Sequence, residues 1–314
     1  VGFNSLADCV TGSANTAVGA NALADTTAGE NAGFGNESLR LNTSGQYNAA
    51  FGANTLKANT TANNNTAVGY NSLGANTTGT PNTACGSYSL NANTTGASNT
   101  ALGSSALQNN TTADNNTGIG RSALLSNTTG TQNVAVGSYA LDANTTAPNN
   151  TAVGYAALGA TTTGSRNTAV GNSALLNNTT GTSNVAVGVN SLNVNTTGDA
   201  NVAVGRSALQ KNTTADNNTA IGHYALEDNT TGTQNVAVGA STLDANTTGQ
   251  FNVALGFEAL SSNTTASNNV AIGRSALFSN TTGANNVAVG RQTLYTNSTG
   301  QDNVAIGELA LDAN

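Results

Sequence analysis

The segment Asn65-Thr-Ala-Val-Gly-Tyr-Asn-Ser-Leu-Gly-Ala-Asn-Thr-Thr-Gly-Thr-Pro81 decides the fold, because the chain repeats it in tandem with small changes. Its glycine, Gly69, has a counterpart at every seventeenth residue from Gly35 to Gly307. Only the first interval differs, because Gly19 and Gly35 are sixteen residues apart. A fixed period this short is typical of repeats that stack along one axis, each bonding only its neighbours.

The composition excludes a large globular core and agrees with a single repeat domain. Charged residues make up 7% of the 314 residues and aromatic residues 4%, with no Trp and no Met. Chains rich in Asn, Thr and Gly can be disordered, but here a leucine keeps its place in each repeat, as at Leu73, Leu90 and Leu107. No linker interrupts the pattern, so we expect one continuous solenoid over residues 1–314. Both ends fall inside a repeat, which predicts that the chain is a fragment of a longer protein.

Each repeat predicts a coil that contains a short β-strand. In Val134-Ala-Val136 the two valines point to one side of a strand and Ala135 to the other. The glycine that follows permits a bend. We expect the valines and Leu141 to supply the apolar contacts within the coil, and Ala135 and Ala140 to form a flat second face that another chain can approach.

Variable pairs mark three solvent-facing corners of the coil, at Arg121-Ser122, Leu125-Ser126 and Thr131-Gln132. The constant runs between them predict three packed sides, on which Asn and Thr stack into ladders that satisfy their polar groups. The prediction is therefore an all-β fold, a parallel β-solenoid or β-roll of about eighteen 17-residue coils.

Association with other copies is the next expectation. Each coil offers few large apolar side chains to offset the entropy lost when seventeen residues become ordered. A lone solenoid would therefore be marginally stable. Together with the flat alanine face, this predicts a homo-oligomer of three parallel chains.

The block Asn-Thr/Val-Ala-Val/Ile-Gly, seen at residues 65–69, 218–222 and 269–273, resembles the head repeats of trimeric autotransporter adhesins. The fuller repeat at residues 65–79 and 150–164 is similar to repeats of phage tail fibres and bacterial surface fibres. The resemblance covers essentially the whole chain. It implies a left-handed parallel β-roll, three chains around a common axis, no cofactor, and a role as a stalk or adhesive fibre. The repeat here is longer than the typical adhesin repeat.

Catalysis and metal binding are not expected. The single histidine, His223, occupies a variable corner place that Arg206 and Ala240 hold in other repeats, so nothing positions it as a base. The carboxylates at Asp142, Asp244 and Asp312 also fall at corners and form no spaced acid pair. The Gly-Gly-x-Gly-x-Asp repeats of calcium-binding β-rolls do not occur. We therefore predict no catalytic, metal-binding or cofactor-binding residue.

Several corner residues are candidates for binding a ligand at the surface. Arg274 and Arg291 occupy the same corner position in consecutive coils. They are either two solvated arginines or a contact for an anion or glycan. Aromatic side chains at corners could stack on sugars or on a neighbouring fibre. They are Tyr70, Tyr88, Tyr139, Tyr155, Tyr224, Phe257 and Tyr295.

Cysteines and glycosylation sequons complete the candidate positions. Cys9 and Cys85 are too many coils apart to form a disulfide within one chain. We expect Cys85 to be a small buried hydrophobe, whereas Cys9 could bridge chains. Asn-Thr-Thr or a close variant forms a sequon in fifteen repeats, from Asn42 to Asn297. These asparagines either carry sugars or form a buried ladder.

The sequence thus predicts a non-enzymatic structural protein, located extracellularly on a cell surface or virion appendage. It would be a fibre shaft or adhesive rod whose partners are further copies of itself and a surface glycan or receptor. With a net charge of −7 and eight scattered Lys and Arg, the chain has no footprint for nucleic acid, and no segment is apolar enough to span a membrane. The alternative is a self-assembling filament whose subunits join end to end. Ice binding is a third class, disfavoured because adjacent threonines of a strand would point to opposite sides.

Overall fold

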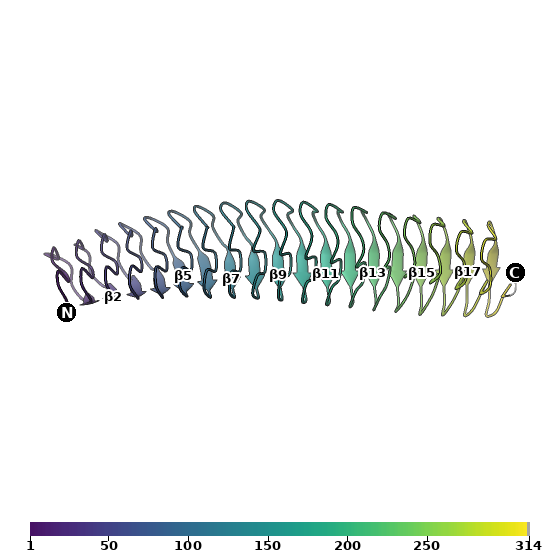
Figure 1. Ribbon diagram of the computed structural model, residues 1–314, viewed down its shortest axis with the longest axis horizontal. Helices are drawn as coiled ribbons and strands as arrows, with labels where there is room; N and C mark the ends of the chain where they lie inside the picture. The colour runs from purple at the N-terminus through teal and green to yellow at the C-terminus, as the bar shows by residue number, and fades with distance from the viewer. Residues whose placement is uncertain (313–314) are drawn as a thin grey trace. The chain divides into compact units, whose positions relative to one another are not determined.

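The computed structural model describes residues 1–312 and forms two compact units, unit 1 (Val1–Ala156) and unit 2 (Ala157–Asn314). Each unit is a stack of coils, and each coil contributes one short strand to a parallel sheet. In Figure 1 the arrows within each unit lie side by side and point the same way. Residues 1–312 contain no helix.

The strands are three or four residues long and recur once in every coil. Those of unit 1 are β1 (Thr16–Val18), β2 (Ala32–Phe34), β3 (Ala49–Phe51), β4 (Thr66–Val68), β5 (Asn82–Cys85), β6 (Asn99–Leu102), β7 (Thr117–Ile119), β8 (Val134–Val136) and β9 (Thr151–Val153). Those of unit 2 are β10 (Thr168–Val170), β11 (Val185–Val187), β12 (Val202–Val204), β13 (Thr219–Ile221), β14 (Val236–Val238), β15 (Val253–Leu255), β16 (Val270–Ile272), β17 (Val287–Val289) and β18 (Val304–Ile306).

The register of the sheet places like residues over like. Between β11 and β12, Val185 pairs with Val202 and Ala186 with Ala203, an offset of one repeat. This confirms the predicted parallel β-solenoid, in which one repeat makes one coil.

The coil has one strand side, not three. The run that contains Leu73 is a turn, in which Asn71 and Leu73 have φ of 57° and 49°. Such left-handed φ values are uncommon for residues other than Gly, yet they recur at the equivalent leucine of every coil. The turn still binds the next coil, because the Leu73 N–H donates to the Ser89 carbonyl at 3.0 Å. Turns and bends thus form two of the three packed sides that the sequence pattern predicts, and only one side is a strand.

The glycine after each strand is required for two reasons. Gly69 has φ of 120°, a region that side chains strongly disfavour. A Cβ placed on Gly69 would also lie 2.7 Å from the carbonyl of Gly86 in the next coil. The close vertical approach of these glycines explains why the seventeen-residue pattern never loses them.

The interior contains the expected leucine together with the alanines that we expected outside. Ala135 and Ala140 are fully buried, and so is Leu141. Val134 is 37% exposed, and Val136 is half-buried on the same side of the strand. The prediction of valines inside and alanines outside is therefore wrong. The coil is so thin that only an alanine fits between the strand and the leucine turn, so the valines must face outward.

Two ladders of buried asparagine confirm the predicted polar core. The first asparagine column opens each repeat, and the N–H of Asn82 donates to Oδ1 of Asn65 at 2.8 Å. The second asparagine column precedes the threonine pair, and Nδ2 of Asn93 donates to Oδ1 of Asn76 at 2.8 Å. Both Asn82 and Asn93 also donate from Nδ2 to the carbonyl of Gly96, at 2.8 and 2.9 Å. Each ladder therefore joins successive coils and also closes its own coil.

The second asparagine column is interrupted twice by threonine. Thr26 still takes part, because Nδ2 of Asn42 donates to its hydroxyl at 3.2 Å. Thr161 is fully buried, and its hydroxyl has no hydrogen-bond partner. Since an unpaired buried polar group costs free energy, Thr161 is a weak point of unit 2.

The sixteen-residue repeat loses one residue at a particular bend. Thr26, Thr27 and Ala28 take the places that Asn42, Thr43 and Gly45 hold in the next coil. The N–H of Thr27 donates to the Thr43 carbonyl at 2.9 Å, and the Ala28 carbonyl accepts from Nδ2 of Asn15 at 2.7 Å. The missing residue corresponds to the exposed Ser44.

Candidate functional site

The outward side of the strands is the most extensive candidate surface of each unit. We call it the strand face: the side chains of the first and third residues of each three-residue strand, such as Val253 and Leu255 in β15. These two are 37% and 45% exposed, whereas Ala254 between them is fully buried. Contiguous exposed apolar surface of this kind is typical of interaction sites. Sequence reasoning missed this face because alternation alone does not say which side of a strand faces the core.

The strand faces of the two units differ in one column. The third strand residue is apolar throughout, as at Val68 in unit 1 and Ile272 in unit 2. The first strand-face residue is Thr or Ala in unit 1, except Val134; in β5 and β6, which begin one residue earlier, it is Thr83 and Thr100. In unit 2 it is Val, except Thr168 and Thr219.

The three corners lie at the surface, as predicted, with small exceptions such as Ser122, which is 8% exposed. The post-strand corner follows the glycine (Tyr70 and Asn71 in the coil of β4). The middle corner follows the leucine (Gly74 and Ala75), and the pre-strand corner ends the repeat (Thr80 and Pro81). The post-strand and pre-strand corners border the strand face on its two edges.

Arginine and aromatic side chains meet at the post-strand corner. The guanidinium of Arg121 lies 5.4 Å from the ring centre of Tyr139, and that of Arg206 lies 5.5 Å from Tyr224. These cation–π contacts run along the stack, from one coil to the next. They hold the arginines at their corner.

His223 is exposed at the same corner, as its variable place predicts. Its ring lies 3.8 Å from that of Tyr224, centre to centre. A phenol ring orients the imidazole but supplies no catalytic partner of the kind that a general base requires.

Arg274 and Arg291 occupy the post-strand corner in consecutive coils. Nε of Arg291 donates to Oε1 of Glu308 at 2.8 Å. The carboxylate of the following coil therefore binds Arg291, and the two arginines do not form a simple cationic pair.

The predicted corner carboxylates share no site. Asp142, Asp244 and Asp312 all lie at the middle corner, and Asp244 and Asp312 are four coils apart. Burial raises the pKa of Asp142 and of Asp244, and Asp244 accepts a hydrogen bond from the Ser261 hydroxyl at 2.7 Å. Burial also raises the pKa of Glu227 at the same corner.

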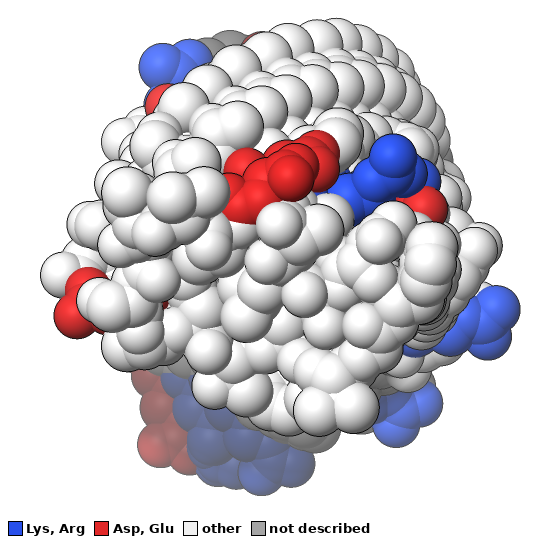
Figure 2. All heavy atoms as spheres, turned by 90° about the vertical axis from the view of Figure 1, so that its left-hand side faces the viewer, with Lys and Arg blue, Asp and Glu red and all other residues white. Residues whose placement is uncertain are grey.

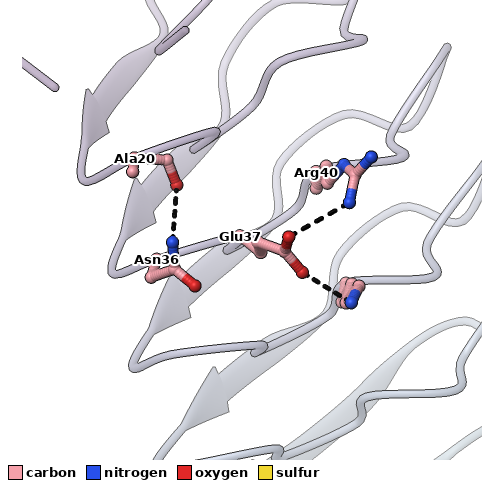
Figure 3. Close-up of polar contacts among 5 residues, drawn as sticks. Ala20, Asn36, Glu37 and Arg40 are labelled. Atoms are coloured by element: carbon pink, nitrogen blue, oxygen red, sulfur yellow. Dashed lines mark hydrogen bonds and ion pairs between the residues drawn. The ribbon is translucent and has the colours of Figure 1, made fainter. Parts of the chain in front are cut away.

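A small charged cluster near the start of unit 1 contains Glu37, Arg40 and Lys57. Oε1 of Glu37 lies 3.1 Å from Nη1 of Arg40, and Oε2 lies 2.5 Å from Nζ of Lys57. Figure 3 shows the Glu37 carboxylate facing Arg40, beside the bond from Nδ2 of Asn36 to the Ala20 carbonyl. The hydrogen bond from Lys57 holds the pKa of Glu37 below its usual value. The cluster links two coils and leaves no unpaired carboxylate for chemistry.

One shallow depression of about 310 Å³ lies on unit 1. It forms where alanines, Ala32 and Ala49, replace larger residues in the first strand position, and Glu30 and Tyr47 line its edge. The hydrogen bond with Glu30 raises the pKa of the Tyr47 phenol. A single carboxylate and a phenol do not make a nucleophile with an activating base.

Both cysteines are free thiols, in agreement with the prediction that they do not pair. Cys85 was expected to be buried, but it is half-buried on the strand face, in the column of Val68 and Leu102. The valine places that it shares point outward, which explains the difference. Cys9 is also half-buried, and its thiol donates to the Gly12 carbonyl at 3.4 Å.

The Asn-Thr-Thr sequons lie in the second asparagine column, which is buried. Asn76 and Asn246 have no exposed surface, and their Nδ2 atoms donate to the preceding asparagine of the ladder. A glycan on Nδ2 would have no room and would take the place of one of the two N–H donors that the ladder uses. The buried-ladder interpretation of the sequons is therefore the one that the structure supports.

The threonine pair does not alternate like a strand. Thr77 and Thr78 lie in a bend, and both reach the surface. The Thr77 hydroxyl donates to the Thr94 carbonyl of the next coil at 3.0 Å, while Thr78 is exposed. The expectation that adjacent threonines point to opposite sides is wrong, because this side of the coil is not a strand.

Charge is sparse on the surface, and most atoms in Figure 2 are uncharged. Among residues 1–312, no group of three or more His, Cys, Asp or Glu side chains is placed to hold a metal ion. The described residues include no helix able to cross a membrane. No family model matches the chain, and no curated protein matches it.

Proposed function

We propose that this chain is a structural, non-enzymatic section of an extracellular fibre, serving as its shaft or as an adhesive rod on a cell surface or virion appendage. The coils support this role, because strand pairing and two asparagine ladders tie each coil to the next. The repeat pattern, which resembles adhesin and tail-fibre repeats, supports it too. The corners, with their scattered tyrosines and arginines, are the part of the surface that would contact a glycan or receptor.

The exposed strand face carries the proposal that copies of the chain associate. Rows of Val, Ile and Leu recur once per coil, and side chains such as Leu255 and Val253 remain 45% and 37% exposed. Burying such rows against another copy removes apolar surface from water, at ~25 cal/mol per Å². The partner surface that matches the row spacing best is an identical row. We therefore propose three parallel chains around a common axis, with their strand faces inside.

Light scattering coupled to size-exclusion chromatography tests this assembly, with the chain as it stands. We expect the mass of a trimer. In the variant Val236→Asp with Val253→Asp, two charges on the strand face should yield monomers. The matched control Asn177→Asp adds a charge at the exposed middle corner of unit 2, away from the strand face, and should remain trimeric. A monomeric parent chain, or equal behaviour of face and corner variants, would contradict the proposal.

End-to-end growth is the competing assembly, and electron microscopy of the same samples separates the two. Particles of one fixed length support the fibre section. Uniform filaments that lengthen with protein concentration would support a self-assembling filament subunit.

Ice binding is a second candidate function, and the threonine bend favours it. Two threonine columns run along the stack, represented by Thr247, which is half-buried, and Thr248, which is exposed. The Thr247 hydroxyl is already used, because it donates to the Thr264 carbonyl at 3.0 Å. Thermal hysteresis of a dilute solution, compared with a Thr248→Lys variant, tests the idea. No hysteresis in the parent chain excludes it.

A further inference from the structure

The depression on unit 1 results from departures from the repeat that coincide in two coils. Among the strands of residues 1–312, the first strand-face residue is alanine only at Ala32 in β2 and Ala49 in β3, and elsewhere it is Thr or Val. The corner residues that precede these two strands are Glu30 and Tyr47. The small alanines leave a volume of about 310 Å³ open beside an acid and an aromatic ring. Small-molecule sites begin at about this size.

The hollow is not filled by larger neighbours on the strand face. The third strand residues of the same coils are Phe34 and Phe51, whose ring centres lie 4.8 Å apart with the ring planes 7° from parallel. The two rings stack on each other in their own column, ~6.6 Å along the strand from the alanines. Neither ring lines the depression. The large third residues therefore do not compensate for the small first residues.

The asparagines that line the depression are fully used by the first asparagine column. The Nδ2 atoms of Asn31 and Asn48 each donate two hydrogen bonds, to acceptors 2.8–3.1 Å away. Their Oδ1 atoms accept the N–H groups of Asn48 and Asn65, both at 3.0 Å. A sugar needs several donors and acceptors for its hydroxyl groups, and these amides have none to spare. The lining is therefore poorly matched to a sugar.

Glu30 supplies the only charge among the described residues of this lining, and it lacks a cationic partner. Arg40 is the first Lys or Arg of the chain, and both Arg40 and Lys57 are bound by Glu37. Asp and Glu, in contrast, occur four times before Arg40. Surroundings of one sign attract the opposite charge, so the depression favours a cation and disfavours an anion.

Tyr47 places an aromatic ring beside this carboxylate. It occupies the position of Glu30 in the next coil, with φ of 59° against 63°, and its phenol donates a hydrogen bond to the Glu30 carboxylate. Tyr47 is 56% exposed, so a ligand can reach its ring. A tyrosine ring attracts a cation that lies over its face. A carboxylate has several acceptor sites, so Glu30 can accept further N–H groups beside the phenol.

We propose that the depression binds a primary ammonium group carried on a short aliphatic chain. The ammonium N–H groups donate to the Glu30 carboxylate, the charge lies beside the Tyr47 ring, and the methylene groups cover Ala32 and Ala49. Every lining residue belongs to one chain, so the site does not depend on association between copies. Such a group occurs in free alkylamines and in the lysine side chains of other proteins.

Saturation-transfer difference NMR of the whole chain tests the site. The probe is n-butylammonium, and n-butanol is the neutral analogue of the same chain length. We expect a saturable signal from n-butylammonium, and binding of n-butanol that is weaker by about fivefold or more. Nα-acetyl-lysine methylamide distinguishes the two sources of the ammonium group. Binding equal to that of n-butylammonium indicates a lysine of a protein partner, and weaker binding indicates a free amine.

Filling the depression tests its location. Ala32→Thr with Ala49→Thr introduces the residue that β1 and β4 carry at this position, so the variant should fold, and it retains Glu30 and Tyr47. This variant and Glu30→Gln should each weaken n-butylammonium binding by about fivefold or more. Asp302→Asn is the matched control, because it removes an acid from the same corner of unit 2 beside a strand that begins with valine. It should leave binding unchanged.

The outcomes are distinct. Unchanged binding of n-butylammonium in the filled variant would place the ligand elsewhere and overturn the inference. Equal binding of n-butanol, or no binding of n-butylammonium, would also overturn it. Saturation by methyl β-glucoside in place of n-butylammonium would assign the depression to a sugar. Light scattering of the same samples reports association between copies, so failure of the fibre proposal and failure of this inference are separate results.

Discussion

The interiors of unit 1 and unit 2 are built from the same residue types, but the strand faces of the two units differ. Ala67 in unit 1 and Ala254 in unit 2 are both fully buried, and so are the leucines and asparagines around them. Outside, the first strand-face residue is Thr66 in β4 and Thr100 in β6 of unit 1, whereas it is valine in most strands of unit 2. The interior fixes the coil, and the first strand residue adjusts how apolar its outer face is.

This difference separates the residues that determine the fold from those that affect association between copies. A threonine and a valine have nearly the same shape, so either fits the pleated strand. They differ in the free energy of leaving water, which matters only when another surface covers them. We therefore expect unit 2 to contribute more than unit 1 to the contact between copies.

The largest effect should appear where the units are alike. Replacing Gly69 in unit 1 or Gly239 in unit 2 by Ala forces a side chain onto a left-handed φ and against the next glycine carbonyl. Each variant should lose about 3 kcal/mol or more of stability in its own unit. Hydrogen exchange resolved by segment measures both losses. A large difference between the two would contradict the shared interior.

Removal of a ladder asparagine should cost somewhat less. Asn76→Ala in unit 1 and Asn246→Ala in unit 2 each delete two donated bonds and leave the next asparagine without its acceptor. We expect a loss of about 2–4 kcal/mol for each, measured by urea denaturation. Asn91→Ala, at a half-exposed middle corner, is the control and should cost less. Stability unchanged in either ladder variant would show that the column is not a structural element.

An exchange of face residues tests the difference itself. Val236→Thr with Val253→Thr gives unit 2 the face of unit 1, and Thr83→Val with Thr100→Val does the reverse. Each valine lost from a buried contact should cost about 1 kcal/mol, so the first variant should associate more weakly and the second more strongly. Sedimentation velocity at several protein concentrations measures the association of both variants. Equal association would mean that the strand faces do not meet.

The smallest expected effect is a pH-dependent change in stability at Asp244 in unit 2. Burial raises the pKa of Asp244 in the folded state, so the folded protein binds its proton more readily than the unfolded chain. The ionised carboxylate therefore costs stability at neutral pH, and this cost disappears as pH falls below the unfolded pKa. Asp244→Asn should raise the melting temperature by about one or two degrees at pH 7. At pH 3 the variant and the parent should melt together.

Glu37 in unit 1 should show the opposite sign. Its pKa is lowered by the Lys57 hydrogen bond, so it stabilises the fold above the unfolded pKa and loses this contribution as pH falls through the folded pKa. Glu37→Gln should therefore lower the melting temperature slightly at pH 7 and have no effect in acid. Because solvent still reaches both carboxylates, both changes in melting temperature should be small.

Periodicity alone predicted the coil, its stacking and its buried asparagine ladders. Because a glycine and a leucine recur at the positions of Gly69 and Leu73 in every repeat, the number of coils could be predicted. The asparagines that recur at the positions of Asn65 and Asn76 predicted the ladders. The direction of Val134 was not predictable in the same way. Alternation assigns Val134 and Ala135 to opposite sides but does not say which side is inside. The width of the coil decides this, and it depends on the turn at Leu73, whose left-handed backbone no local propensity indicates.

The candidate surface was predictable only in part. The variable corners at Arg121 and Thr131 were correctly placed near solvent, because variation among internal repeats reports exposure. The strand face was missed, since its residues vary only between Val, Thr and similar side chains and so resemble a core. Handedness and the number of associated chains remain predictions that come from the resemblance.

The shortened coil near the start of unit 1 indicates where this architecture accepts changes of length. At Thr27 and Ala28 one residue is absent, yet the bonds from Asn15 and to Thr43 are in place on either side of the gap. The omitted place belongs to an exposed threonine or serine through which neither asparagine ladder passes. Peptides or labels inserted at this bend, for example after Thr129 or Thr231, should therefore project from the stack. Insertions in successive coils would be spaced by one coil and would leave the asparagine ladders and the strand pairing unchanged.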